Sequence, residues 1–462
     1  MIQCAIISLG CPKNLVDSEQ MLGLLKKNGI QITQNIENAD VVIINTCGFL
    51  SASREESLAN IHTLEMWRRD PSHPLRALIV AGCLVSRDRE ALVDACPDVD
   101  VFLDVFSREE IFNVLQTILS KDVSDVPSQN FLPLFSGVPG HVAADTHRHP
   151  LLPPHVAYLK IAEGCNRRCA FCAIPLIRGP YVSKPLPEII SEAKNLAASG
   201  VKEIILIAQD TTVYGKDLKT PDGSPQNTTL AQLLAALSEI DAIRWIRVMY
   251  LYPQNFGDDL IDAFASLPKV LPYIDIPLQH INDRVLKDMC RNTTRAATLE
   301  LLEKLYARIP HLAVRTAFIV GFPGETQAEY NELLAFIRKQ KFQRLGVFEF
   351  SPEEGTAAAE MPRSVPEKTI KKRAETIMKV QRDISAAWLR SLIGKKMDIL
   401  LDVAAENASP VGQNTFIGRS IYDAPEIDGC VYVTGENLHV GDIISCEIID
   451  SYEYDLIAVP VS

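Results

Sequence analysis

Three cysteines stand close together in the middle of the chain, and their spacing could hold a metal centre. Cys165, Cys169 and Cys172 form a CxxxCxxC pattern directly after an apolar run at 156–162. Three thiolates can bind three irons of a 4Fe–4S cluster and leave the fourth iron open to a substrate. The alternative is a zinc knuckle, which closes with a fourth ligand. Because no cysteine or histidine follows in residues 173–192, the spacing favours the open cluster.

Three further cysteines recur at equal intervals near the N-terminus. Cys11, Cys47 and Cys83 are separated by 47 − 11 = 36 and 83 − 47 = 36 residues, about one strand–helix unit each. Each lies shortly after an apolar run with the length and composition of a strand. A helical pattern between the first two runs ends at an Asn-Gly pair, a usual helix stop. The predicted strands are 4–9, 41–45 and 78–81.

This alternation predicts a doubly wound parallel sheet over residues 1–125. Ligands of such sheets bind outside the carboxyl ends of the strands, where all three cysteines are expected. The three thiols should therefore converge and hold a second cluster by three thiolates. The alternative is that each cysteine is a small buried side chain, which is the usual place of a free cysteine.

The chain has 462 residues, enough for about three domains. Its formal net charge of −12 argues against a nucleic acid as the main partner, because a phosphate backbone needs a basic surface. No apolar run is long enough to span a membrane. The eleven cysteines do not form a disulfide framework, and thiols kept reduced for metal binding fit the cytoplasm.

A linker rich in proline, glycine and histidine is expected over 126–151, and strand-like runs alternate with helical patterns over 152–382. Five such runs and the one before Cys165 make six strands, which predicts a partial, TIM-like (β/α)6 barrel. Barrel enzymes place their chemistry in loops at the carboxyl ends of the strands. The five runs are 203–208, 245–250, 273–277, 314–320 and 345–350.

The last domain is expected over 384–462 as a small all-β barrel of the OB type, because five short strand patterns are separated by turn residues. From Lys395 onward the chain has three basic and twelve acidic residues, a net charge of 3 − 12 = −9. This surface would repel a phosphate backbone and attract a basic protein.

These motifs resemble known families. The CxxxCxxC loop resembles the radical SAM superfamily, and the tail resembles a TRAM domain. The segments Gly10-Cys11-Pro12-Lys13-Asn14, Asn45-Thr46-Cys47-Gly48 and Ala81-Gly82-Cys83 resemble the N-terminal domain of the methylthiotransferases. The first segment has the form of the RimO branch, whereas the tRNA-modifying MiaB branch typically has Gly-Cys-Gln-Met-Asn there.

The superfamily resemblance implies that S-adenosylmethionine (SAM) binds the open iron. It also implies SAM contacts from Gln209 and Asp210 after the second strand, from Arg315, and from the backbone at Gly321. Ordinary structural roles compete with each of these assignments. Asp210 could cap a helix, Arg315 could form an ion pair within the barrel, and Gly321 could simply allow a tight turn.

The branch resemblance implies a transferase that adds a methylthio group to the β-carbon of an aspartate of the small-subunit ribosomal protein S-twelve, a basic protein. One SAM would supply the radical and a second the methyl group, while the cluster on Cys11, Cys47 and Cys83 would deliver sulfur. An electron donor and a sulfur donor are then further partners. Two alternatives stay open: a tRNA adenosine methylthiotransferase, and a non-enzymatic iron–sulfur carrier or scaffold.

Overall fold

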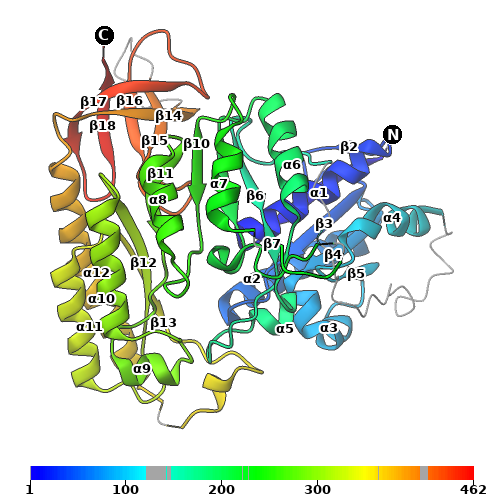
Figure 1. The fold of residues 1–462 in the computed structure, drawn as a ribbon. Coiled ribbons are helices and arrows are strands. Elements are labelled where there is room, and N and C mark those ends of the chain that lie inside the picture. Colours follow the sequence, from blue (N-terminus) through cyan, green and yellow to red (C-terminus); the bar gives the residue numbers. More distant parts are fainter. Residues whose placement is uncertain are drawn as a thin grey trace.

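The computed structural model describes residues 2–120, 142, 147–220, 222–226, 228–362, 364–405 and 415–461. Most of the linker expected over 126–151 lies outside these residues. Three large sheets and one two-stranded sheet organise the described chain (Figure 1). Among the described residues, no helix is both long and apolar enough to cross a membrane.

The first sheet has five parallel strands in the order β2-β1-β3-β4-β5. Every residue of β3 and β4 is buried, as expected for a parallel sheet covered on both faces. The predicted doubly wound sheet is therefore confirmed, although the short strands β2 and β5 were not predicted. Its elements are β1 (Gln3–Ser8), α1 (Pro12–Lys27), β2 (Gln31–Ile32), β3 (Val41–Thr46), α2 (Ser51–Arg69), β4 (Ala77–Gly82), α3 (Cys83–Ala95), β5 (Val101–Leu103) and α4 (Ile111–Ser120).

The second sheet has six parallel strands in the order β13-β12-β11-β10-β9-β6, so the predicted partial barrel is confirmed. Its outer face packs against helices through one large apolar cluster. The strands are β6 (Val156–Lys160), β9 (Glu203–Ile207), β10 (Trp245–Val248), β11 (Val270–Asp275), β12 (Ala313–Val320) and β13 (Arg344–Glu349). The helices are α6 (Leu186–Ala198), α7 (Leu230–Ser238), α8 (Asp258–Ser266), α9 (Asp283–Asp288), α10 (Arg295–Arg308), α11 (Gln327–Gln340) and α12 (Glu367–Arg390).

A closed five-stranded barrel follows α12, as predicted. Its strands pair in the order β14-β15-β16-β18-β17. Figure 1 shows it at one end of the six-stranded sheet, away from the N-terminal domain. Its strands are β14 (Lys396–Ala404), β15 (Thr415–Ser420), β16 (Val431–Thr434), β17 (Ile443–Ser451) and β18 (Leu456–Pro460).

The C-terminal barrel closes the amino end of the six-stranded sheet. Glu203, the first residue of β9, binds Arg419 of β15 with 2.6 Å between Oε2 and Nη1. Arg344, the first residue of β13, forms an ion pair with Asp423. Apolar side chains of the inner face, such as Tyr273, pack into the core of the C-terminal barrel. The two domains therefore share one core.

This docking revises the role expected for the acidic tail. Asp402 pairs with Arg419 and His155, and Asp423 and Asp428 pair with arginines of the six-stranded sheet. These three carboxylates hold the domains together and are not presented to a partner. Other acidic residues of the tail are exposed, among them Asp398, Glu426, Asp450 and Glu453.

Candidate active site

The CxxxCxxC loop is held at the carboxyl end of the six-stranded sheet by a short hairpin. Strands β7 (Ala162–Glu163) and β8 (Val182–Ser183) pair just before and after the loop and helix α5 (Ile174–Arg178). The backbone N–H of Cys165 donates to Gly179 O at 3.0 Å, and that of Ala170 donates to Met289 O at 3.0 Å. The loop is thus fixed by its backbone, and its thiols need not shape it.

Arg167 belongs to this loop and connects it to Asp210, which lies in the segment after β9. Its Nε lies 2.8 Å from Asp210 Oδ2, and its Nη1 donates to Gln254 Oε1 at 2.5 Å. Its guanidinium lies over the ring of Tyr252, 3.9 Å from the ring centroid. Asp210 also caps the 3-10 helix at Thr211–Val213 by accepting from the N–H of Thr212 at 3.1 Å. Capping and contact with the cysteine loop therefore coexist at Asp210.

Arg291 approaches the same loop from the segment after α9. Its guanidinium also lies over Tyr252, at 4.0 Å, and its Nη1 lies 3.6 Å from Cys169 Sγ. Cys165 Sγ accepts the N–H of Arg167 at 3.4 Å. Donors aimed at cysteine sulfur stabilise the negative charge of an iron–sulfur cluster and tune its potential.

Buried polar atoms without a partner also gather here. Among the residues that the structure describes, Arg167 Nη2 and Arg291 Nε are buried at this site and form no hydrogen bond. Buried polar groups are rarely left unpaired unless a ligand or water satisfies them. These two donors, beside the thiols of the loop, suit a cluster with a ligand that has an anionic group, such as the carboxylate of SAM.

The other three residues predicted to contact SAM differ in their surroundings. Gly321 follows β12 with φ +79°, and its N–H donates to Glu325 Oε2 at 2.6 Å, so the turn itself requires it. Its neighbour Ile319 packs in one cluster with Ala170 of the cysteine loop. Arg315 is already engaged in ion pairs, 2.7 Å from Asp275 and 3.6 Å from Asp428. Gln209 is half-buried beside Asp210.

The N-terminal cysteines lie at the carboxyl ends of three adjacent strands, as predicted. Cys11 precedes α1, Cys47 directly follows β3, and Cys83 begins α3. Their loops are in close contact: a Cβ on Gly10 would lie 2.8 Å from Cys47 Cβ, and one on Gly48 would lie 2.8 Å from the Cys83 backbone. Only glycine permits this approach.

Asn14 joins these three strand ends. Its Nδ2 donates to Leu9 O at 3.0 Å and to Thr46 O at 2.8 Å, so it ties the ends of β1 and β3. Its Oδ1 lies 3.3 Å from Cys83 Sγ. One side chain of the Gly-Cys-Pro-Lys-Asn segment therefore positions the surroundings of all three cysteines.

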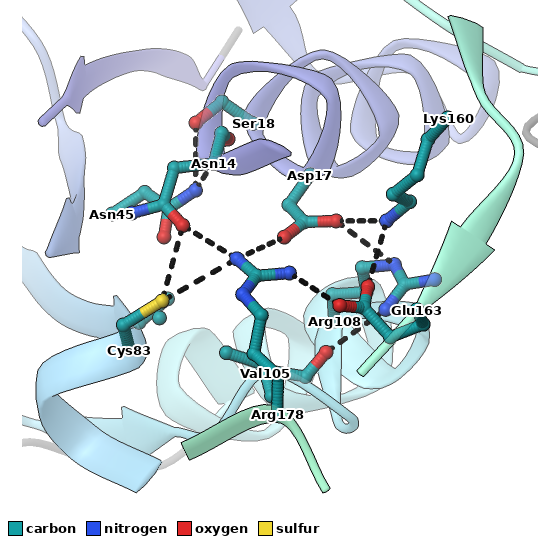
Figure 2. Close-up of polar contacts among 12 residues, drawn as sticks. Asn14, Asp17, Ser18, Asn45, Cys83, Val105, Arg108, Lys160, Glu163 and Arg178 are labelled. Carbon is teal, nitrogen blue, oxygen red and sulfur yellow. Dashed lines mark hydrogen bonds and ion pairs between the residues drawn. The ribbon is translucent and has the colours of Figure 1, made fainter. Parts of the chain in front are cut away.

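A buried ionic network connects Cys83 of the N-terminal triplet with Glu163, which precedes the CxxxCxxC loop, as Figure 2 shows. Arg178 of α5 lies at its centre and is 1% exposed. Its Nη1 lies 2.9 Å from Glu163, two residues before Cys165, and its Nη2 lies 3.0 Å from Asp17 of α1. The same Nη2 donates to Cys83 Sγ at 3.4 Å. A single guanidinium thus contacts both domains and one of the predicted ligands.

The charges of this network suit an anionic group at the N-terminal triplet. Asp17 and Glu163 face three cations, because Lys160 and Arg108 join Arg178 around them. Buried charge without compensation is costly. Arg178 also lies 3.4 Å from Cys83 Sγ, so its positive charge can compensate a thiolate of the N-terminal triplet. The donor set therefore fits a cluster bound there.

Burial raises the pKa of Cys83 in one triplet and of Cys172 in the other to about 12, and that of Cys165 to about 11. Free thiols at these positions are therefore protonated at neutral pH. Metal binding requires thiolates and releases these protons. Thiols on one cluster bind different irons, so they need not come as close together as the ligands of a single ion.

Comparison with known proteins identifies the family. Residues 3–104 match the Uncharacterized protein family UPF0004, 159–337 the Radical SAM superfamily, and 393–461 the TRAM domain. The "Ribosomal protein uS12 methylthiotransferase RimO" of Anaeromyxobacter sp. (strain K) is 43% identical over 450 residues, 97% of this chain and 91% of that protein. Its namesake in Desulforamulus reducens is 42% identical over 459 residues, 99% of each chain. The chain belongs to the RimO family.

Membership of the RimO family confirms the resemblance inferred from the motifs. It makes the chain a radical SAM transferase, with SAM and a 4Fe–4S cluster as cofactors. The RimO protein of Geobacter sulfurreducens, 42% identical over 99% of this chain and 98% of its own length, extends the same match.

Two solved structures share the fold. Both are of the radical S-adenosylmethionine methyltransferase TsrM from Kitasatospora setae, at 12% identity. The one with tryptophan and a SAM analogue bound has a TM-score of 0.53 and covers 88% of this chain and 79% of TsrM. The one with cobalamin and a [4Fe-4S] cluster bound has a TM-score of 0.50 and covers 77% and 73%. At this identity the likeness concerns the fold alone.

Sequence reasoning missed several residues of the site. Arg178, Arg291 and Tyr252 belong to no recognisable spacing, and their contacts depend on segments far away in the chain. Lys13 lies inside the Gly-Cys-Pro-Lys-Asn segment and Glu163 lies two residues before Cys165, but the motifs gave neither residue a role. Of these residues, only Lys13 could have been singled out from the sequence. It follows the predicted ligand Cys11 by two residues, so its charge must lie close to the site.

Proposed function

We propose that this chain adds a methylthio group to the β-carbon of an aspartate of ribosomal protein uS12. The relatives that share 42–43% identity along 97–99% of the chain carry this activity in their names. The structural observation that carries the proposal is the contact of Arg178 with Cys83 on one side and Glu163 on the other. It supports two cysteine triplets that work as one site.

In this proposal Cys165, Cys169 and Cys172 hold the 4Fe–4S cluster that binds SAM. The second triplet, Cys11, Cys47 and Cys83, holds an auxiliary 4Fe–4S cluster that carries sulfur. The proposed SAM contacts are Gln209, Asp210, Arg315 and Gly321, of which Asp210 has the strongest support because Arg167 links it to the cysteine loop. The proposed domains are 1–125, 152–382 and 384–462, with 126–151 as a linker.

The chemical difficulty is the unactivated C–H bond at the aspartate β-carbon. Side-chain acids and bases cannot open it at neutral pH, and the bound cluster with SAM supplies the radical chemistry that can. The residues of the chain itself bind and orient the reactants and exclude water from the site. Asp17 of helix α1 binds Arg178 of α5 beside the cysteine loop, while the C-terminal barrel closes the opposite end of the six-stranded sheet.

The substrate is a protein in this proposal, and its basic character suits the exposed carboxylates of the C-terminal barrel. Complementary charge speeds encounter and selects among partners more than it adds affinity. An electron donor and a sulfur donor complete the partners, and the cytoplasm is the proposed location.

Mass spectrometry of uS12 from cells with and without this enzyme tests the proposal. We expect one methylthio group on one aspartate, present only with the enzyme. Unmodified uS12 together with a loss of methylthio-adenosine from tRNA would instead assign the chain to the tRNA branch. Reduced protein that forms no 5′-deoxyadenosine from SAM would contradict the radical chemistry and favour an iron–sulfur carrier.

A further inference from the structure

We propose that Lys13 binds the side-chain carboxylate of the acceptor aspartate and so determines which residue of the substrate enters the site. This inference rests on the proposed function and names a residue that selects its substrate.

Three lysines are buried in the described chain, and Lys13 differs from the other two. Lys160 is fully buried and lies 2.5 Å from Asp17 and 3.3 Å from Glu163. Lys184 is fully buried and lies 2.7 Å from Glu192. Lys13 is 3% exposed, yet within the described ranges no carboxylate lies within ion-pair distance of its Nζ. Buried ammonium groups are normally paired, so Lys13 lacks its anion.

The contact that Lys13 does make is with an aromatic face. Its Nζ lies 2.9 Å from the ring centroid of Tyr250, which follows β10. Tyr250 has φ +60°, a left-handed conformation that costs energy in a residue other than glycine. Such strain is common where a side chain must be held for function. The ring thus positions the ammonium without neutralising it.

The nearby carboxylate of Asp275 is already engaged. Its Oδ1 lies 2.7 Å from Arg315, and its Oδ2 accepts the N–H of Tyr250 at 2.8 Å. Asp275 therefore acts on Lys13 only at longer range. Two anions could therefore complete the pair, a cluster held at Cys11 or a carboxylate that enters from outside.

The place of Lys13 suits an aspartate substrate. Cys11 is the N-cap of α1 and Lys13 is two residues further on, so both lie on its first turn. The carboxylate of an aspartate is one bond from its β-carbon. A carboxylate held at Lys13 would therefore keep the β-carbon close to the triplet that carries sulfur. The positive end of the α1 dipole favours an anion at the same position.

A competing role for Lys13 is to balance the charge of the cluster on Cys11. That role predicts a loss of iron or of cluster potential in a lysine variant, with no effect on the choice between an acid and an amide. If Lys13 binds the substrate, a lysine variant should keep its iron and cluster potential but lose the preference for an acid over an amide. An asparagine in place of the acceptor would leave the buried ammonium unpaired, so discrimination between the two is the decisive readout.

The experiment measures the Kd and the methylthiolation kinetics of uS12 with its acceptor aspartate or with asparagine in that position. The enzymes are the reconstituted wild type, Lys13→Met and, as a matched control, Lys26→Met, whose lysine is exposed near the other end of α1. Iron content and SAM cleavage without substrate are measured for each. The wild type should bind the aspartate form about ten- to a hundredfold more tightly.

For Lys13→Met we expect unchanged iron and SAM cleavage, a KM raised by about ten- to a hundredfold, and loss of the preference for aspartate. Lys26→Met should behave as the wild type. Equal discrimination by Lys13→Met and wild type would overturn the inference. If Lys13→Met loses iron, the test is the affinity of the wild type for the aspartate and asparagine forms of uS12. Equal affinity for the two forms would overturn the inference. A wild type that leaves uS12 unmodified would instead refute the proposed function.

Discussion

Arg178 Nη2 lies 3.4 Å from the sulfur of Cys83, and this contact links the radical SAM domain to a predicted ligand of the N-terminal domain. The same guanidinium binds Glu163, which stands just before the other cysteine triplet. A substitution of Arg178 should therefore affect both cysteine triplets and the contact between the two domains.

The first prediction concerns stability. Arg178→Gln removes the cation between Asp17 and Glu163 and leaves both buried carboxylates with less compensation. Breaking one partner of a buried pair costs about 3–5 kcal/mol. We expect the free energy of unfolding of the cluster-free protein to fall by that amount in urea titrations. Arg76→Gln, at an exposed arginine before β4, should change it by less than about 0.5 kcal/mol.

The second prediction concerns iron. The reconstituted wild type should bind roughly eight irons per chain, and the variant with Cys11, Cys47 and Cys83 all changed to Ala should bind roughly four. That variant should still cleave SAM, because the other triplet is intact. Colorimetric iron analysis checks the number, and an unchanged iron content would refute the auxiliary cluster.

The third prediction concerns Arg167 in the cysteine loop. Arg167→Gln removes the charge that pairs with Asp210 and lies over Tyr252. A hydrogen bond to a charged group contributes about 1.5–3 kcal/mol, so the rate of 5′-deoxyadenosine formation should fall by roughly ten- to a hundredfold. The neighbour Arg168 is exposed and offers the control Arg168→Gln. Equal rates for both variants would argue against a positioning role.

The fourth prediction concerns a contact between domains at Glu353, which is 1% exposed. Its carboxylate lies 3.1 Å from Arg87 of α3 and accepts the N–H of Ser51 at the start of α2 at 3.0 Å. Glu353→Gln should weaken this contact and increase amide hydrogen exchange over residues 47–54, beside Cys47. The adjacent Glu354 is exposed, so Glu354→Gln should leave exchange in that segment unchanged.

The strands and the cysteine triplets could be predicted because their signals are local. Strands such as β3 and β12 are runs of apolar, β-branched residues, and short connections leave few ways to arrange them. Cysteine spacing is likewise readable, since a CxxxCxxC loop brings its own ligands together. The N-terminal triplet needed one more step, the rule that ligands gather at the carboxyl ends of parallel strands.

The acidic tail shows where such reasoning stops. Its composition is a property of the sequence, but the direction in which each carboxylate points is not. Asp423 and Asp428 face arginines of the six-stranded sheet because the C-terminal barrel docks on the amino end of that sheet. Charge counting treated them as exposed, and only the packing of the two domains corrects that.

The sequence by itself thus determined the fold of the three domains and the family, and it predicts the six cysteine ligands. The tertiary structure decided which side chains connect the two triplets. Cys83 and Arg178 are 95 residues apart, and Ser51 and Glu353 are 302 residues apart. Neither pair forms a local pattern, because burial and charge compensation act through space and depend on how whole domains pack. For the same reason, the sequence contains Lys13 but does not show that its charge is buried without an anion.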